Sequence, residues 1–148
     1  MKKILVSVLQ VAVFFAAGSM WASDVDIARL KRLIEIPSVS SNIVEVNRAV
    51  DFLSGELGSD GLWCKVETMS DGRRVLFAAN EDNRRPDVLL SAHIDVVPAM
   101  DRSQFIPRRE NGRIYGHGAH TAVEYVNISS LDDYADLIAR YLLEHCAR

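Results

Sequence analysis

Apolar side chains recur every three or four residues along two early stretches of the chain, the spacing expected for one face of an α-helix. The first stretch follows Ser23 or Asp24, either of which can cap a helix, and it ends before Pro37. The second stretch runs from about residue 44 to residue 57. Gly58 follows it directly and is expected to end the helix. We therefore predict two consecutive amphipathic helices.

A third amphipathic stretch lies at the end of the chain, from Ser130 to about His145. Its start carries Ser130 and, three residues later, Asp133, which is a variant of the capping box. The apolar stripe of this stretch consists of Leu131, Tyr134, Ile138, Tyr141 and Leu142. We predict one long C-terminal helix, with His145 offsetting the negative end of its dipole.

Between these helices the pattern changes to short apolar or alternating runs, which are typical of β-strands. Strands are predicted at residues 63–68, 74–79 and 88–94, with a shorter one near 113–115. The sequence Ser70-Asp71-Gly72 separates the first two runs and is typical of a turn. Helices, then strands, then a helix predict an α/β chain, a three-layer sandwich fragment with a mixed sheet.

The first residues have a different pattern. Lys2 and Lys3 precede an apolar run from residue 4 to residue 17, which is too short to span a membrane comfortably. A charged start followed by such a run is typical of a secretory signal peptide. With cleavage after Ser19 or Ala22, we expect a signal peptide at residues 1–22, a domain at 23–148, and a periplasmic or secreted protein that leaves the membrane. The alternative is an uncleaved N-terminal anchor.

The composition is that of a single small domain of 148 residues with a net charge of −3. Its arginine pairs, at residues 73–74, 84–85 and 108–109, are scattered near predicted turns. A nucleic acid, which needs a clustered basic face, is therefore not an expected partner. The two cysteines, Cys64 and Cys146, leave open whether the chain forms a disulfide or keeps two free thiols.

The third predicted strand ends in a candidate chemical site. His93 and Asp95 are two residues apart, and alternate residues of a strand point to the same face. An imidazole can bind a metal ion, and a neighbouring carboxylate can orient that imidazole or tune the metal. An isolated pair of this kind is also compatible with a strand-end histidine beside a solvated aspartate. The motifs that surround the pair favour the metal site.

Four short segments of the chain occur in an order that is typical of one enzyme family. They are Ile34-Glu35-Ile36-Pro37-Ser38-Val39-Ser40, Ala92-His93-Ile94-Asp95-Val96-Val97-Pro98, Phe105-Ile106-Pro107 and Asn111-Gly112-Arg113-Ile114-Tyr115-Gly116. Together they resemble the N-terminal signature of the zinc metallopeptidase family of aminoacylase, acetylornithine deacetylase, succinyl-diaminopimelate desuccinylase and glutamate carboxypeptidase. Four ordered matches over roughly eighty residues are more specific than any single motif. The resemblance implies the catalytic domain of that family.

After Gly116 the chain no longer matches the N-terminal signature, and the residues that follow resemble a different motif of the same family. In the family the N-terminal signature continues to an aspartate that bridges two zinc ions, whereas this chain continues with His117-Gly118-Ala119-His120. The segment from His120 to Val126 resembles the family's far C-terminal motif, whose histidine is the last zinc ligand. We interpret the chain as an internally deleted member, in which an N-terminal part, residues 23–116, is joined to a C-terminal segment, residues 117–148.

The resemblance implies two zinc ions as cofactors and assigns roles to individual residues. His93 belongs to one zinc and His120 to the other, while Asp95 is the orienting catalytic carboxylate. The bridging aspartate, the general-base glutamate and a further acidic ligand belong to the part that the chain lacks, and Glu124 is not that base. A catalytic zinc ion usually has three protein ligands, so at most partial zinc binding is expected.

Two functions remain open. Taken literally, the resemblance implies an exported zinc-dependent peptidase or amidohydrolase that hydrolyses a peptide or N-acyl amino acid amide bond. The alternative is a non-catalytic truncated remnant or a weak metal-binding accessory protein. A site rebuilt from the imidazoles of His93, His117 and His120 is a further hypothesis, and a partner chain that supplies the missing ligands is another.

Overall fold

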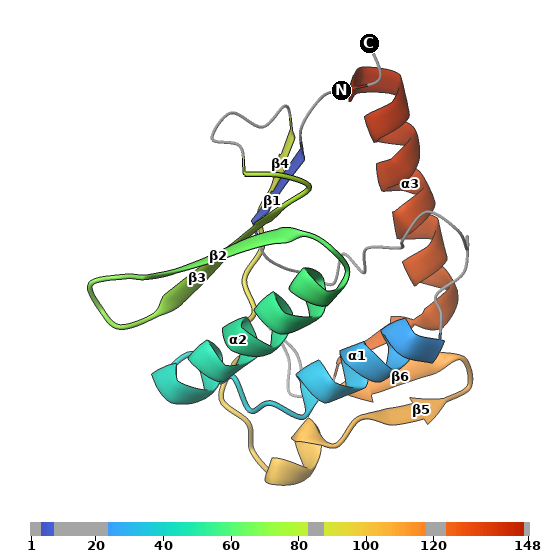
Figure 1. Ribbon diagram of the computed structural model, residues 1–148. Helices are drawn as coiled ribbons and strands as arrows, with labels where there is room; N and C mark the ends of the chain where they lie inside the picture. Colours follow the sequence, from blue (N-terminus) through green and yellow to red (C-terminus); the bar gives the residue numbers. More distant parts are fainter. Residues whose placement is uncertain (1–3, 8–23, 83–87, 118–123, 147–148) are drawn as a thin grey trace.

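The computed structural model describes residues 4–7, 24–82, 88–117 and 124–146 (Figure 1). The α-helices are α1 (Asp24–Ile34), α2 (Ile43–Ser59) and α3 (Ile128–Cys146), and a short 3-10 helix covers Arg102–Phe105. The strands are β1 (Ile4–Ser7), β2 (Trp63–Thr68), β3 (Arg74–Ala79), β4 (Val88–Leu90), β5 (Arg108–Glu110), β6 (Arg113–Gly116) and β7 (Glu124–Asn127). The predicted α/β class is confirmed.

The first sheet has the strand order β2-β3-β1-β4. The hairpin β2–β3 is antiparallel, β1 is antiparallel to β3 and parallel to β4, and the sheet is therefore mixed. Helix α2 lies along the β2–β3 hairpin (Figure 1) and buries Val46, Ala49 and Val50, three residues of one helical face. Leu76 on β3 is 1% exposed, and burying a side chain of that size contributes about 1.5–3 kcal/mol to folding.

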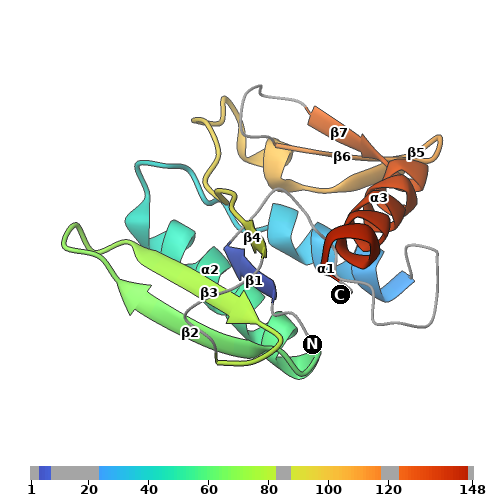
Figure 2. The same ribbon diagram turned by 90° about the horizontal axis from the view of Figure 1, so that it is seen from above.

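The second sheet is antiparallel, with the order β5-β6-β7, and it packs against α1 (Figure 2). Its core consists of Ile27 and Leu30 from α1 and Ile114 from β6, flanked by Ile34, Val126 and Ile128. The described elements thus form two sheets, each with its own helix, where the sequence predicted one sheet of a three-layer sandwich. The loops between the two sheets hold the candidate site.

An arginine on α1 ties the two helices together. Arg29 donates through Nε to Glu56 Oε2 at 2.8 Å and through both terminal nitrogens to the Asp60 carboxylate, also at 2.8 Å. The guanidinium is flat and carries its donors in a fixed fork, so it fits two carboxylates at once. These bonds raise the pKa of Arg29, the bond to Asp60 most of all.

Two helix ends differ from their predictions. Helix α2 continues past Gly58 to Ser59, and the positive φ of 85° falls on Gly61 instead, so the predicted stop at Gly58 is wrong. Helix α3 begins at Ile128, and the Ser130 hydroxyl donates to the backbone oxygen of Asn127 at 2.7 Å. Ser130 therefore lies inside the helix, and the predicted capping box is wrong because the helix starts two residues earlier.

The N-terminal segment and the cysteines can be placed only in part. Residues 4–7 form β1, and the rest of the predicted signal peptide lies outside the described residues, so its cleavage stays a prediction. No helix within the described ranges has both the length and the apolar character needed to cross a bilayer. Cys64 on β2 is a free thiol whose pKa is raised by burial, and the side chain of Cys146 is not among those described.

Candidate functional site

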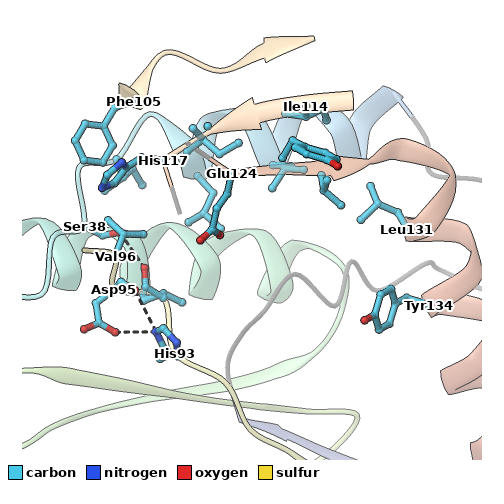
Figure 3. Close-up of a pocket in the computed structure, with 18 residues that line it drawn as sticks. Ser38, His93, Asp95, Val96, Phe105, Ile114, His117, Glu124, Leu131 and Tyr134 are labelled. Carbon is cyan, nitrogen blue, oxygen red and sulfur yellow. Dashed lines mark hydrogen bonds and ion pairs between the residues drawn. The ribbon is translucent and has the colours of Figure 1, made fainter. Parts of the chain in front are cut away.

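A pocket of about 420 Å³ lies between α1, the loop after β4, strands β6 and β7, and the first turns of α3 (Figure 3). Its polar lining includes Ser38, His93, Asp95, His117 and Glu124. Its apolar lining includes Leu30, Leu33, Ile34, Ile36, Ile114, Val126 and Leu131. The pocket therefore combines an extended apolar wall with a few polar groups, which is the usual character of a small-molecule site.

The loop that carries His93 and Asp95 is held by the segment around Val39. Strand β4 ends at Leu90, earlier than the predicted residue 94, so both residues lie in a loop. Val39 and Val96 form a parallel bridge, in which Val96 N donates to Ser38 O and Ser40 N donates to Val96 O, each at 3.0 Å. Two of the four family-like segments of the sequence are thus hydrogen-bonded to each other.

The structure brings His93 and Asp95 into contact. Nδ1 of His93 lies 3.1 Å from Oδ1 of Asp95 and 3.1 Å from the Asp95 backbone oxygen (Figure 3). Because both oxygens only accept, Nδ1 carries the proton of this contact. The His93 side chain is 53% exposed and that of Asp95 is 34% exposed, so the pair stands at the edge of the pocket.

The Asp95 carboxylate is stabilised in its charged form. Its pKa is lowered, chiefly by a hydrogen bond from the Ser40 hydroxyl and also by the bond and the charge of His93, while burial opposes the shift. The Ser40 hydroxyl also lies 3.1 Å from the Val96 backbone oxygen. Its single proton serves one acceptor at a time, so Ser40 shares its donor between the carboxylate and the loop backbone.

His117 also holds the loop after β4, through a hydrogen bond to Val97. It is 7% exposed, its Nε2 donates to the backbone oxygen of Val97 at 2.7 Å, and its ring packs against Phe105 with the ring centres 5.0 Å apart. The sequence analysis gave His117 a place only in the three-imidazole hypothesis and assigned it no structural role. Its Nε2 bonds a carbonyl oxygen, and His120 lies outside the described residues, so the hypothesis of a three-imidazole site stays a prediction.

A close approach between α1 and β6 fixes the floor of the pocket. A Cβ atom added to Gly116 would lie 2.7 Å from Cγ2 of Ile34, so only glycine fits there without movement. In the register of β6 and β7, Gly116 stands directly opposite Glu124. Opposite residues of an antiparallel pair lie on the same face, and Glu124 accordingly lines the pocket (Figure 3).

The metal-binding set expected from the resemblance is not complete within the described residues. Across the described ranges, no three His, Cys, Asp or Glu side chains come together in a way that could hold a metal ion. His120, the second predicted zinc ligand, lies outside those ranges. His93 as a zinc ligand and Asp95 as a catalytic residue stay predictions, although the two residues are in contact.

Comparisons with known proteins give two partial matches. The chain is 33% identical over 96 residues to a protein of Ehrlichia canis named succinyl-diaminopimelate desuccinylase, covering 60% of this chain and 24% of that protein. It is 30% identical over 86 residues to an Aspergillus clavatus protein named as a probable carboxypeptidase, covering 58% of this chain and 19% of that protein. No family model and no solved structure matches the chain.

These matches support a peptidase or deacylase family for the chain. The chain spans about a quarter or less of the length of the relatives that it matches. What the rest of those proteins does therefore does not transfer to this chain directly.

Proposed function

We propose that the chain is an exported peptidase- or amidohydrolase-type protein that binds a peptide or N-acyl amino acid beside His93 and hydrolyses its amide bond. It would be a fragment of a zinc-peptidase catalytic domain of the three-layer α/β type, shortened by an internal deletion. The observation that carries the proposal is the His93–Asp95 pair at the edge of a largely apolar pocket.

The pocket suits a ligand that has an apolar part and a polar end. Its volume of about 420 Å³ is sufficient for a modified amino acid or a short peptide. The aliphatic wall from α1 and β6 would take the acyl group or an apolar side chain. The amide end of the ligand would lie toward the polar lining of the pocket, where His93, His117 and Glu124 stand.

The His93–Asp95 pair orients one ring nitrogen, Nε2 of His93, for contact with a ligand. Asp95 accepts a hydrogen bond from Nδ1–H of His93, and in the neutral imidazole the second ring nitrogen, Nε2, carries the lone pair. That nitrogen can accept a proton or bind a metal ion, because a neutral imidazole does both. Asp95 is the positioning residue of this pair, since it fixes the tautomer and the ring orientation.

Zinc is the cofactor that the family resemblance implies, but the described side chains do not fit a catalytic zinc site. Such a site needs three protein ligands and an open position. Among the described residues, no three His, Cys, Asp or Glu side chains come together in this way. We therefore assign no step of the reaction to zinc.

The lack of a three-residue metal group among the described side chains favours a second candidate function. A chain with one oriented imidazole, and no three-residue metal group in its described part, would bind a peptide-like ligand or a metal ion weakly and would not turn substrate over. In this second function the chain is a non-catalytic remnant or a weak metal-binding accessory protein that uses the same pocket.

The test measures zinc content and amino acid release together, on the full chain supplied with zinc. The probes are N-acetylated amino acids and dipeptides. Hydrolysis by the wild type, abolished in His93→Ala and reduced at least about 10-fold in Asp95→Asn, would support the first candidate. Asp71→Asn is the matched control, because Asp71 is an exposed carboxylate at the β2–β3 turn that bonds Arg73. Little bound zinc and no release would leave the non-catalytic function.

A further inference from the structure

The turn of the β2–β3 hairpin lies beside the first turns of α2 and is hydrogen-bonded to that helix (Figure 1). Asn47 of α2 donates through Nδ2 to the backbone oxygen of Gly72 at 2.9 Å and accepts through Oδ1 from the backbone nitrogen of Arg74, also at 2.9 Å. The amide side chain thus binds the chain on both sides of Arg73. The position of Arg73 is therefore fixed by a turn that the helix holds in place.

From this turn the side chain of Arg73 reaches a segment 33 residues earlier in the chain. Its Nη2 donates to the backbone oxygen of Ser40 at 2.7 Å, and this bond is partly buried. Its Nη1 also bonds the Asp71 carboxylate at 2.8 Å, but the Arg73 side chain is 42% exposed and that of Asp71 is 50% exposed. An exposed ion pair contributes little, whereas a short hydrogen bond from a charged donor to a partly buried carbonyl is one of the stronger kinds. The bond to Ser40 is therefore the main contact of the Arg73 side chain.

Ser40 connects this contact to the candidate site. Its hydroxyl donates to the Asp95 carboxylate and also lies 3.1 Å from the backbone oxygen of Val96. Its backbone nitrogen donates to the same Val96 oxygen at 3.0 Å. Ser40 thus binds the site through its hydroxyl and its nitrogen, and it binds the guanidinium of Arg73 through its carbonyl. A shift of the Ser40 backbone would change how well the hydroxyl reaches Asp95.

Arg73 shares a second pocket with the His93–Asp95 pair. This pocket of about 460 Å³ lies between α2, the turn of the β2–β3 hairpin and the loop after β4, and its lining includes Arg73, His93 and Asp95. His93, Ile94 and Asp95 line the first pocket as well, whereas Arg73 does not. A ligand in the first pocket would therefore meet the loop and not Arg73, so Arg73 can act on the site only through the loop.

We propose that Arg73 is a positioning residue of the His93–Asp95 pair. By holding the Ser40 backbone, Arg73 keeps the Ser40 hydroxyl on the Asp95 carboxylate. That carboxylate accepts from Nδ1–H of His93 and so orients the ring. In a connected hydrogen-bond network each member positions the next, and the loss of one member is felt by the others. The inference rests on the proposed function, in which the His93 imidazole acts on a ligand, and it makes the β2–β3 turn a part of that site.

The tautomer of the His93 ring reports this positioning without any substrate. Long-range proton–nitrogen NMR spectra of the full chain, recorded free of metal at about pH 9 where histidine is neutral, distinguish the Nδ1–H form from the Nε2–H form. The His93→Ala spectrum identifies the signals. We expect the Nδ1–H form to predominate in the wild type and Arg73→Gln to lower the ratio of the two forms at least about 3-fold. Arg74→Gln is the matched control and should leave the ratio unchanged, because Arg74 is a neighbouring turn residue, 40% exposed, that bonds Asp51. A wild type without a predominant Nδ1–H form, or an Arg73→Gln ratio equal to that of the control, overturns the proposal.

A double substitution tests the route through Ser40. Ser40→Ala removes the hydroxyl and is expected to lower the ratio by itself. In that background Arg73→Gln has no hydroxyl to position and should change the ratio by less than about 1.5-fold. An Arg73→Gln effect of the same size in both backgrounds overturns the proposal. Hydrolysis is measured separately: if the wild type releases no amino acid while the tautomer ratios change as expected, the proposed hydrolysis fails and the positioning of His93 by Arg73 stands.

Discussion

The hydroxyl of Ser38 donates a hydrogen bond to the backbone oxygen of Ile94 at 2.9 Å, although 56 residues of sequence separate them. Ser38 is 4% exposed, and the bond is partly buried beside the pocket. Ile94 stands between His93 and Asp95, and its carbonyl is therefore fixed at the centre of the candidate site. The segment after α1 thus determines where the imidazole and the carboxylate lie.

Removing that hydroxyl should destabilise the fold. Ser38→Ala leaves the partly buried Ile94 carbonyl without its side-chain donor, and we expect a loss of about 1–2 kcal/mol in the free energy of unfolding, measured in urea. Ser59→Ala is the control, because its hydroxyl bonds Gly55 O on an exposed helix end, and its effect should stay within about 0.5 kcal/mol. Equal effects of the two substitutions would contradict a special role for Ser38.

Gly116 cannot gain a side chain without movement of α1. In Gly116→Ala the new methyl group meets Ile34, and we expect a loss of about 1–3 kcal/mol as the helix is displaced from β6. Gly55→Ala is the matched control, because a methyl group at that exposed position of α2 meets nothing within 4 Å. It should raise stability by about 0.5–1 kcal/mol. Thermal unfolding of both variants checks the opposite signs.

Arg29 makes the shortest ion pairs between α1 and the C-terminal end of α2, and Arg32 adds a bond to Glu56 Oε1 at 3.3 Å. Arg29→Ala breaks the bonds to Glu56 and Asp60, and we expect the free energy of unfolding to fall by about 1–2 kcal/mol. This is less than for a fully buried ion pair, because the Arg29 side chain is 26% exposed and solvent screens its charge. Arg48→Ala removes a more exposed pair with Glu45 within α2 and should cost about 0.3–0.5 kcal/mol. High salt should weaken the Arg29 contribution less than an exposed pair would be weakened.

Asp95 should make the stability depend on pH. Its pKa in the folded chain is lowered by the Ser40 hydroxyl and by His93, so the charged carboxylate stabilises the folded state at pH values above its unfolded pKa of about 4. That contribution is lost as the pH falls through the folded pKa. The stability difference between wild type and Asp95→Asn should therefore shrink from about pH 7 to about pH 3. A difference that is constant over this range would argue against the Ser40–Asp95–His93 contacts.

The elements with strong local signals could be predicted from the sequence. Strands β2 and β3 have the predicted bounds, because β-branched and aromatic residues flank a turn in which Gly72 has a φ of 86°. Strands β5 and β7 were missed. The three residues of β5 are charged and exposed, and their pairing with β6 is a tertiary effect that no local pattern reveals.

The contact between His93 and Asp95 was expected from the sequence, but the structure produces it in a different way. Alternation along a strand was expected to place His93 and Asp95 together, but the strand ends at Leu90. Their contact depends on the bridge between Val39 and Val96, which joins residues far apart in sequence. The support from His117 had no signal at all, since a buried histidine bonded to a backbone carbonyl looks like any other histidine in a sequence.

Strand β1 gives the beginning of the chain two competing uses. Residues 4–7 are hydrogen-bonded to β3 on one side and to β4 on the other, so they hold two strands of the sheet together. The same residues belong to the apolar run that would direct export. If the chain folds before export, the predicted signal segment is paired inside the sheet and is not accessible for recognition. If the chain is cleaved after residue 22, β3 and β4 lose the strand that lies between them. The order of folding and cleavage would then decide which sheet the mature protein has.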